Sequence, residues 1–140
     1  MGYRSKIRVV TTFEGFKAMR EIAFEIAKKN GIPSVILLFP APGTEKEFYD
    51  YCATWGDCFC FGFDWIKWCD NYKYVSLFMD TLKVANERGI NWQFVRVGGG
   101  SEDIENLSSD NFYDNNFAIT IYPYGDDIGY CYHYFPNYYL

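Results

Sequence analysis

The stretch YRSKIRVVTTFEGFKAMREIAFEIAKKNG, residues 3–31, changes its periodicity at Thr12 and thereby indicates the fold class. Residues 3–12 alternate between two faces and are rich in β-branched side chains, which predicts a β-strand. One face would carry Ile7, Val9 and Thr11, and the other Arg8 and Val10. A strand that leads directly into a helix is typical of a fold that mixes both element types.

From Thr12 onward the apolar residues recur every three or four positions, as they do on the buried side of an amphipathic helix. These positions are Phe16, Met19, Ile22, Ala23, Ile26 and Ala27. Thr12 has a side chain suited to an N-cap. Two lysines followed by Asn30 and Gly31 are a typical helix end. We therefore predict a helix from Thr12 to about Asn30.

The next segments predict further strands and a shorter helix. PSVILLFP, residues 33–40, is a short apolar run between two prolines, which predicts a strand. In residues 42–56, Thr44 and Glu47 have the spacing of a capping box, which predicts two to three helical turns. Aromatic and small residues alternate in residues 57–68, which again favours a strand.

The second half predicts another long helix and a hairpin. Helical periodicity spans residues 70–89, a strand follows at 90–99, and an acidic loop leads to two strands at 117–124 and 128–135. We expect one domain, residues 1–140, of the α+β class. The expected sheet is mainly antiparallel, with two long helices packed on one face in a split βαβ or ferredoxin-like variant, a short inserted helix and a C-terminal hairpin.

Charge is divided unevenly along the chain. All 13 lysines and arginines lie at or before Arg96, whereas the residues after it carry only acids. The acids are Glu102, Asp103, Glu105, Asp110, Asp114, Asp126 and Asp127. The same part of the chain is rich in tyrosine, a residue enriched in binding surfaces. We expect an acidic face that attracts a basic partner, and no direct sequence-specific binding of DNA.

The cysteines do not predict a metal or catalytic site. They are Cys52, Cys58, Cys60, Cys69 and Cys131, and their spacing does not match two zinc knuckles. Cys58 and Cys60 would share one strand face as buried thiols. The single histidine, His133, lies two residues after Cys131, without a nucleophile motif beside it. We expect free thiols, no cofactor, no metal and no enzymatic activity.

Two segments offer alternatives for anion binding. The glycines at 98–100 could form an anion nest, but the lysine of a phosphate loop is missing and three acids follow. We therefore interpret this loop as the border between a core strand and the acidic part. Separately, aromatic and basic residues could form a nucleotide pocket, with core packing of the tryptophans as the alternative. Its members would be Trp65, Lys67, Trp68, Tyr72 and Arg96.

The sequence contains neither an apolar run of about 18 residues, as a membrane span requires, nor the apolar core of a signal peptide at its start. With an odd number of cysteines, this pattern favours a cytoplasmic setting. The sequence leaves the oligomeric state open.

Three stretches together resemble a group of small phage and prophage proteins of unknown function. They are MGYRS at residues 1–5, WIKW at 65–68 with Asp70 and Tyr72, and VRVG at 95–98 followed by acids. The resemblance covers about a third of the chain. No catalytic residues are established for this group, so the resemblance assigns none to this sequence. The insertion at residues 32–55 and the tyrosine-rich tail depart from it. The resemblance implies a protein that works inside a bacterial cell.

We accordingly expect a non-enzymatic protein that inhibits a bacterial defence system, of the anti-CRISPR type. Its acidic, tyrosine-rich surface would block a basic nucleic-acid-binding groove on a host defence protein or its nucleoprotein complex. The alternative is a small-molecule binder that sequesters a nucleotide immune signal in the Trp/Tyr/Lys pocket.

Overall fold

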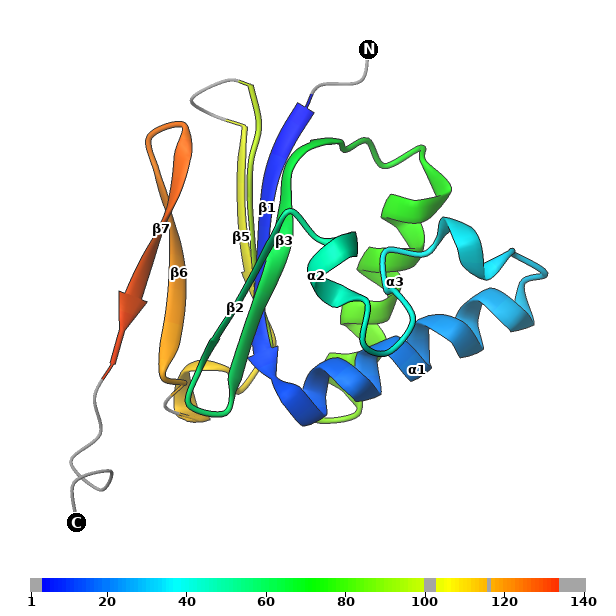
Figure 1. Ribbon diagram of the computed structural model, residues 1–140, viewed down its shortest axis with the longest axis horizontal. Helices are drawn as coiled ribbons and strands as arrows, with labels where there is room; N and C mark the ends of the chain where they lie inside the picture. Colours follow the sequence, from blue (N-terminus) through cyan, green and yellow to red (C-terminus); the bar gives the residue numbers. More distant parts are fainter. Residues whose placement is uncertain (1–3, 100–102, 116, 134–140) are drawn as a thin grey trace.

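The computed structural model describes residues 4–99, 103–115 and 117–133. Within them, a five-stranded sheet forms the middle of the molecule, and every pair of neighbouring strands in it is antiparallel (Figure 1). In spatial order its strands are β2 (Tyr51–Trp55), β3 (Cys58–Lys67), β1 (Arg4–Thr12), β4 (Gln93–Val97) and β5 (Ile104–Ser108). The expected α+β class with a mainly antiparallel sheet is confirmed.

Two long helices, α1 (Phe13–Lys29) and α3 (Lys73–Glu87), pack on one face of this sheet (Figure 1). The Thr12 hydroxyl accepts a hydrogen bond from the Gly15 N–H at 2.9 Å, so the predicted N-cap is confirmed. Among the described residues the remaining helical pieces are short. They are α2 (Glu45–Phe48) and the 3-10 turns Ser34–Ile36 and Tyr113–Asn115.

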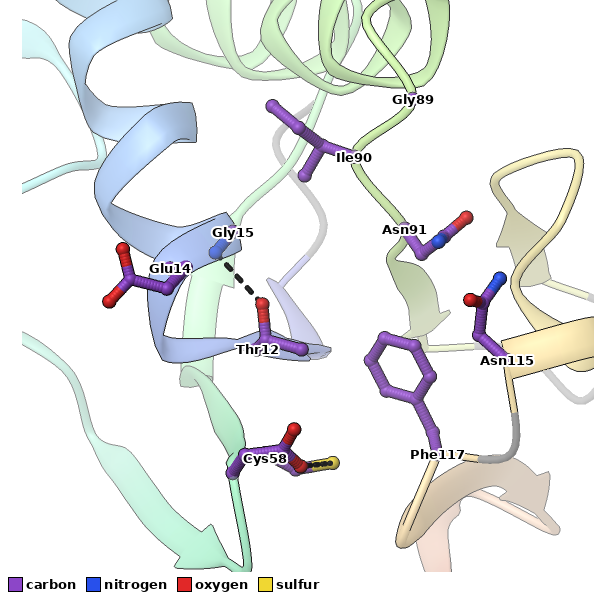
Figure 2. Close-up of a pocket in the computed structure, with 10 residues that line it drawn as sticks. Thr12, Glu14, Gly15, Cys58, Gly89, Ile90, Asn91, Asn115 and Phe117 are labelled. Carbon is purple, nitrogen blue, oxygen red and sulfur yellow. Dashed lines mark hydrogen bonds between the residues drawn. The ribbon is translucent and has the colours of Figure 1, made fainter.

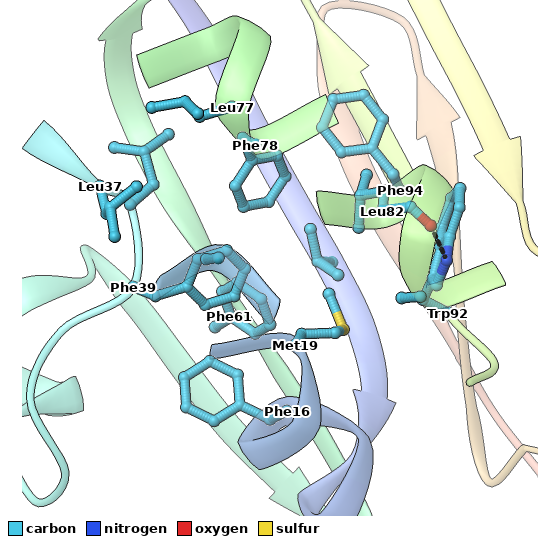
Figure 3. Packing of buried hydrophobic residues seen from close by; sticks show 14 of the residues in the cluster. Phe16, Met19, Leu37, Phe39, Phe61, Leu77, Phe78, Leu82, Trp92 and Phe94 are labelled. Carbon is cyan, nitrogen blue, oxygen red and sulfur yellow. Dashed lines mark hydrogen bonds between the residues drawn. The ribbon is translucent and has the colours of Figure 1, made fainter. Parts of the chain in front are cut away.

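The core between helices and sheet is largely aromatic (Figure 3). Phe16 of α1 meets Phe61 of β3 at a ring-centroid distance of 5.0 Å, and Phe78 of α3 stacks on Phe39 at 5.4 Å. The indole N–H of Trp92 donates to the Leu82 carbonyl, which satisfies its polar atom inside the core.

The opposite face of the sheet is covered by a hairpin of β6 (Ile119–Tyr124) and β7 (Asp127–Tyr132), shown in orange and red in Figure 1. A second apolar cluster fills the space between hairpin and sheet. Its buried members are Val10, Cys58, Cys60, Val95, Val97, Phe112, Phe117, Ala118, Ile119, Ile121 and Ile128. The described chain therefore has three layers: helices, sheet and hairpin. The predicted alternation in β1 is confirmed, because Ile7 and Val9 face the helices while Val10 faces the hairpin.

Three local predictions in the first half of the chain are wrong. Residues 34–39 form a 3-10 turn and an irregular segment instead of a strand, because the prolines at both ends disfavour pairing in the sheet. Leu37, Leu38 and Phe39 still fill the core, whereas Val35 is exposed. The helix expected in 42–56 is confined to α2, and residues 51–55 pair with β3 as β2. Thr44 does not cap α2, because its hydroxyl donates to the Ala41 carbonyl.

The acidic segment expected as a loop contains β5, whose alignment with β4 pairs Arg96 with Glu105. As an edge strand it is half exposed, so its sequence is polar and lacks the apolar run of a central strand.

Candidate functional site

The segment after β5 covers the sheet as a layer without lysine or arginine. Residues 110–115 and 117–133, which we call the hairpin layer, carry Asp110, Asp114, Asp126 and Asp127 and no lysine or arginine. The layer also exposes aromatic rings. The exposed tyrosines are Tyr113 (62%), Tyr122 (43%), Tyr124 (72%) and Tyr132 (49%). Tyrosine and aspartate are close in sequence at the hairpin turn, as Tyr124 and Asp126, and again as Tyr113 and Asp114.

The position of the Tyr122 ring requires a glycine in the neighbouring strand. It pairs with Gly129 across the hairpin, and a Cβ added at Gly129 would lie 2.4 Å from Tyr122 Cζ. The ring therefore covers Gly129 on the outer side of β7. Tyr124 lies close by, with its ring centroid 6.4 Å from that of Tyr122.

A buried arginine ties the hairpin to the sheet. Arg8 is only 4% exposed, and its guanidinium donates to Tyr130 Oη and to Asp64 Oδ1, both at 2.6 Å. The guanidinium carbon also lies 4.3 Å from the ring centroid of Tyr51. Burial opposes the charge, but the hydrogen bonds to Asp64 and Tyr130 leave the pKa of Arg8 raised.

Some of the acidic residues predicted to bind a partner already form ion pairs within the chain. Arg96 donates from Nη2 to Asp103 Oδ1 and from Nε to Glu105 Oε1, both at 2.6 Å. The hydrogen bond from Arg96 lowers the pKa of Asp103 below its ordinary 3.8. Gly98 makes this contact possible, because a Cβ there would meet Asp103 Oδ2 at 1.8 Å. Two predicted partner-binding acids are therefore paired with a predicted anion-binding arginine.

The other predicted acids lie at two ends of the molecule. Lys6 donates to Asp127 at 2.7 Å, at the end of the sheet where Asp103 lies, and this bond lowers the pKa of Asp127. Asp126 is exposed beside it. At the opposite end, the Asp110 N–H donates to the Asn86 side chain, and Asp114 is exposed in the nearby 3-10 turn. Glu102 lies outside the described residues.

The structure does not bring the predicted nucleotide pocket together. Trp68 is buried in the helix-side core, where it contacts Phe78 and Phe94, as core packing predicts. Tyr72 stacks on Tyr74, and Lys67 is exposed at the end of β3. Trp65 is 72% exposed and lines a different hollow.

A hollow of about 520 Å³, which the sequence did not indicate, lies beside the start of α1. Figure 2 shows the residues that line it. Glu14 and Asp57 contribute carboxylates to its lining, and no lysine or arginine among the described residues lines it. The amide groups that line it already have partners, since Asn91 accepts from Ser109 and Asn115 donates to the Asn111 carbonyl. This hollow lacks the positive charge that an anionic ligand would require.

The described residues contain no group of three or more His, Cys, Asp or Glu side chains placed to hold a metal ion. All five cysteines are free thiols, and Cys58 and Cys60 both face the hairpin. Burial raises the pKa of Cys60 to about 12, which makes it a poor nucleophile at neutral pH. His133 Nε2 lies 3.0 Å from Thr120 Oγ1.

Comparison of the chain with protein-family models, with curated proteins and with solved structures found no match. Within the described ranges, none of the helices has the length and apolar character needed to cross a membrane.

Proposed function

We propose that this chain is a non-enzymatic binding protein whose hairpin layer docks onto a basic, nucleic-acid-binding surface of a bacterial defence complex, as an anti-CRISPR protein would. The observation that carries the proposal is the composition of that layer: four aspartates, four exposed tyrosines and no lysine or arginine.

Charge supports the choice of partner. A surface of one sign attracts a partner of the opposite sign and repels nucleic acid itself. Other lysines lie on the helix side of the sheet, for example Lys17 and Lys28 on α1 and Lys83 on α3, whereas Lys6 and Arg8 of β1 contact the layer through Asp127 and Tyr130. The hairpin layer therefore offers a basic groove the kind of negative charge that its nucleic acid normally supplies.

The tyrosines support docking on a protein. Tyrosine combines a large apolar ring with a hydroxyl group and is enriched at binding hot spots. Tyr122 and Tyr124 are exposed on the hairpin, with Asp126 at the turn next to them. We assign these three residues the central role, because Asp103, Glu105 and Asp127 already form ion pairs with Arg96 or Lys6.

We also propose a bacterial cytoplasmic setting. It rests on the resemblance of the MGYRS, WIKW and VRVG stretches to phage and prophage proteins.

We further propose that the sheet is a ferredoxin-like variant. The strand order β2-β3-β1-β4 supports this arrangement. In that order, α1 leads from β1 toward β2 and α3 leads from β3 to β4, and the two strands of each pair are separated by one other strand.

Phage plating on a bacterium with active CRISPR immunity tests the proposal. Expression of the wild-type chain should restore plating of a targeted phage, whereas Tyr124→Ala combined with Asp126→Lys should not. Phe24→Ala, which alters an exposed aromatic residue on α1, is the matched control and should behave as wild type. Equal plating with the double variant and the wild type would refute a role for the hairpin layer.

A further inference from the structure

An irregularity in the pairing of β1 with β3 places two consecutive side chains on one face of the sheet. Ser5 pairs with Ile66 and Ile7 pairs with Phe63, so that Asp64 and Trp65 together oppose the single residue between Ser5 and Ile7. This is a β-bulge, a feature that redirects side chains and is frequent beside binding sites.

The bulge interrupts the alternation of β3. Phe63 and Ile66 both pack against the helix-side core although they are three residues apart. Asp64 and Trp65 between them both reach the hairpin side, where Asp64 binds Arg8. A regular strand would have directed Trp65 to the helices. Instead its indole is 72% exposed.

Trp65 lines a hollow of about 740 Å³ between the end of the sheet and the hairpin turn. Arg4 and Lys6 of β1 line it as well, together with Gly98 and Asp126. The size is within the range of about 300–1,000 Å³ that is typical of small-molecule sites.

The charges around this hollow are only partly compensated. Asp64 is paired with Arg8 at 2.6 Å and Lys6 with Asp127 at 2.7 Å. The Arg4 guanidinium has no carboxylate within 4.0 Å in the described part of the chain, and its hydrogen bond is a long one, 3.5 Å, to the Trp65 carbonyl. Arg4 therefore places an available cation close to an exposed indole.

We propose that this hollow binds a nucleotide. The base would stack on the Trp65 ring, and the phosphate would be bound by Arg4 with support from Lys6. The Asp126 carboxylate, which has no ion-pair partner among the described residues, would accept a hydrogen bond from a ribose hydroxyl or a base amino group. This site differs from the pocket expected from the sequence, because of those five residues only Trp65 belongs to it.

Calorimetric titration of the full chain with 5′-AMP and 5′-GMP, with adenosine and inorganic phosphate as partial ligands, tests the proposal. We expect saturable binding of at least one nucleotide and weaker binding of both partial ligands. Trp65→Ala should weaken nucleotide binding by roughly 5- to 150-fold, the range expected for loss of one stacking platform. Arg4→Ala should weaken nucleotide binding while leaving the affinity for adenosine unchanged.

Trp55→Phe is the matched control, because Trp55 is also partly exposed but lies at the opposite end of β3, beside Tyr132. It should bind nucleotide as the wild type does. Absence of saturable heat with both nucleotides at millimolar concentration would overturn the proposal. So would an affinity that neither Trp65→Ala nor Arg4→Ala reduces. Neither outcome depends on partner docking, because Trp65 and Arg4 lie outside the hairpin layer and the two proposed sites share only Asp126.

Discussion

The side chain of Gln93 forms two hydrogen bonds with the backbone of Ile121. Its Nε2 donates to the Ile121 carbonyl at 2.6 Å, and its Oε1 accepts from the Ile121 N–H at 2.9 Å. Gln93 is fully buried in β4, and Ile121 lies in β6. One amide group therefore holds the hairpin layer on the sheet in a fixed position.

Replacing Gln93 by methionine keeps the approximate size of the side chain and removes both bonds to Ile121, together with the bond that Gln93 Nε2 donates to Asn106 Oδ1 at 3.1 Å. We expect Gln93→Met to lower the free energy of unfolding by about 2–4 kcal/mol, because two buried backbone groups lose their partners. Urea denaturation measures this change. A loss below about 0.5 kcal/mol, the usual range for surface substitutions, would contradict the role of Gln93.

Arg8→Lys should destabilise the fold although it conserves charge. Lysine lacks the planar fork that reaches Tyr130, Asp64 and two carbonyl groups at once. We expect a loss of about 1–3 kcal/mol in urea denaturation. Arg88→Lys is the matched control, since its pair with Glu25 is exposed and should change stability by less than about 1 kcal/mol. Equal losses of unfolding free energy for both substitutions would show that Arg8 contributes no more to stability than an exposed arginine.

Asp103 should titrate below its ordinary pKa of 3.8 in the folded chain, since Arg96 stabilises its charged form. A folded pKa below the unfolded value contributes stability above the unfolded pKa, and this contribution is lost as the pH falls through the folded pKa. Carboxyl NMR titration measures the folded value. Arg96→Gln should return it toward 3.8, and Arg88→Gln should leave it lowered. An unchanged midpoint in Arg96→Gln would contradict this pairing.

Gly129→Ala should displace the Tyr122 ring from β7, because the added Cβ would overlap it. Loss of this cross-strand contact should cost about 0.2–1 kcal/mol, so that the hairpin stays folded while its outer surface changes. Amide chemical shifts of Ile128 and Tyr130 report the displacement. Shifts identical to those of the wild type would mean that the ring does not lie over Gly129 in solution.

Periodicity predicted the elements that have one clear buried side. The long helices could be predicted because their apolar stripes match the layer that buries them, and Thr12 marked the start of the first one. β1 could be predicted because Ile7 and Val9 alternate with Arg8 and Val10. A continuous apolar run such as residues 34–39 indicates buried residues but does not show whether they pair as a strand. β5 buries too little of its surface to show the alternation of apolar and polar residues that predicts a strand.

The candidate sites depend on long-range geometry that composition does not contain. The acidic half was visible in the sequence, but the pairing of Arg96 with Asp103 and Glu105 required the register of β4 and β5. Trp65 and Trp68 looked alike as neighbours in one aromatic segment. Only the bulge in β3 separates them, with one ring exposed on the hairpin side and the other buried under the helices.

We propose that the hairpin layer competes with nucleic acid for a basic surface. Displacement of fluorescent target DNA from purified CRISPR effector complexes tests this competition. The wild-type chain and Phe24→Ala should release DNA from a susceptible complex with equal affinity. Tyr124→Ala combined with Asp126→Lys should bind at least tenfold more weakly, about 1.4 kcal/mol. Displacement by this double variant as efficient as by the wild type, or no displacement by the wild type from any complex, would contradict the claim.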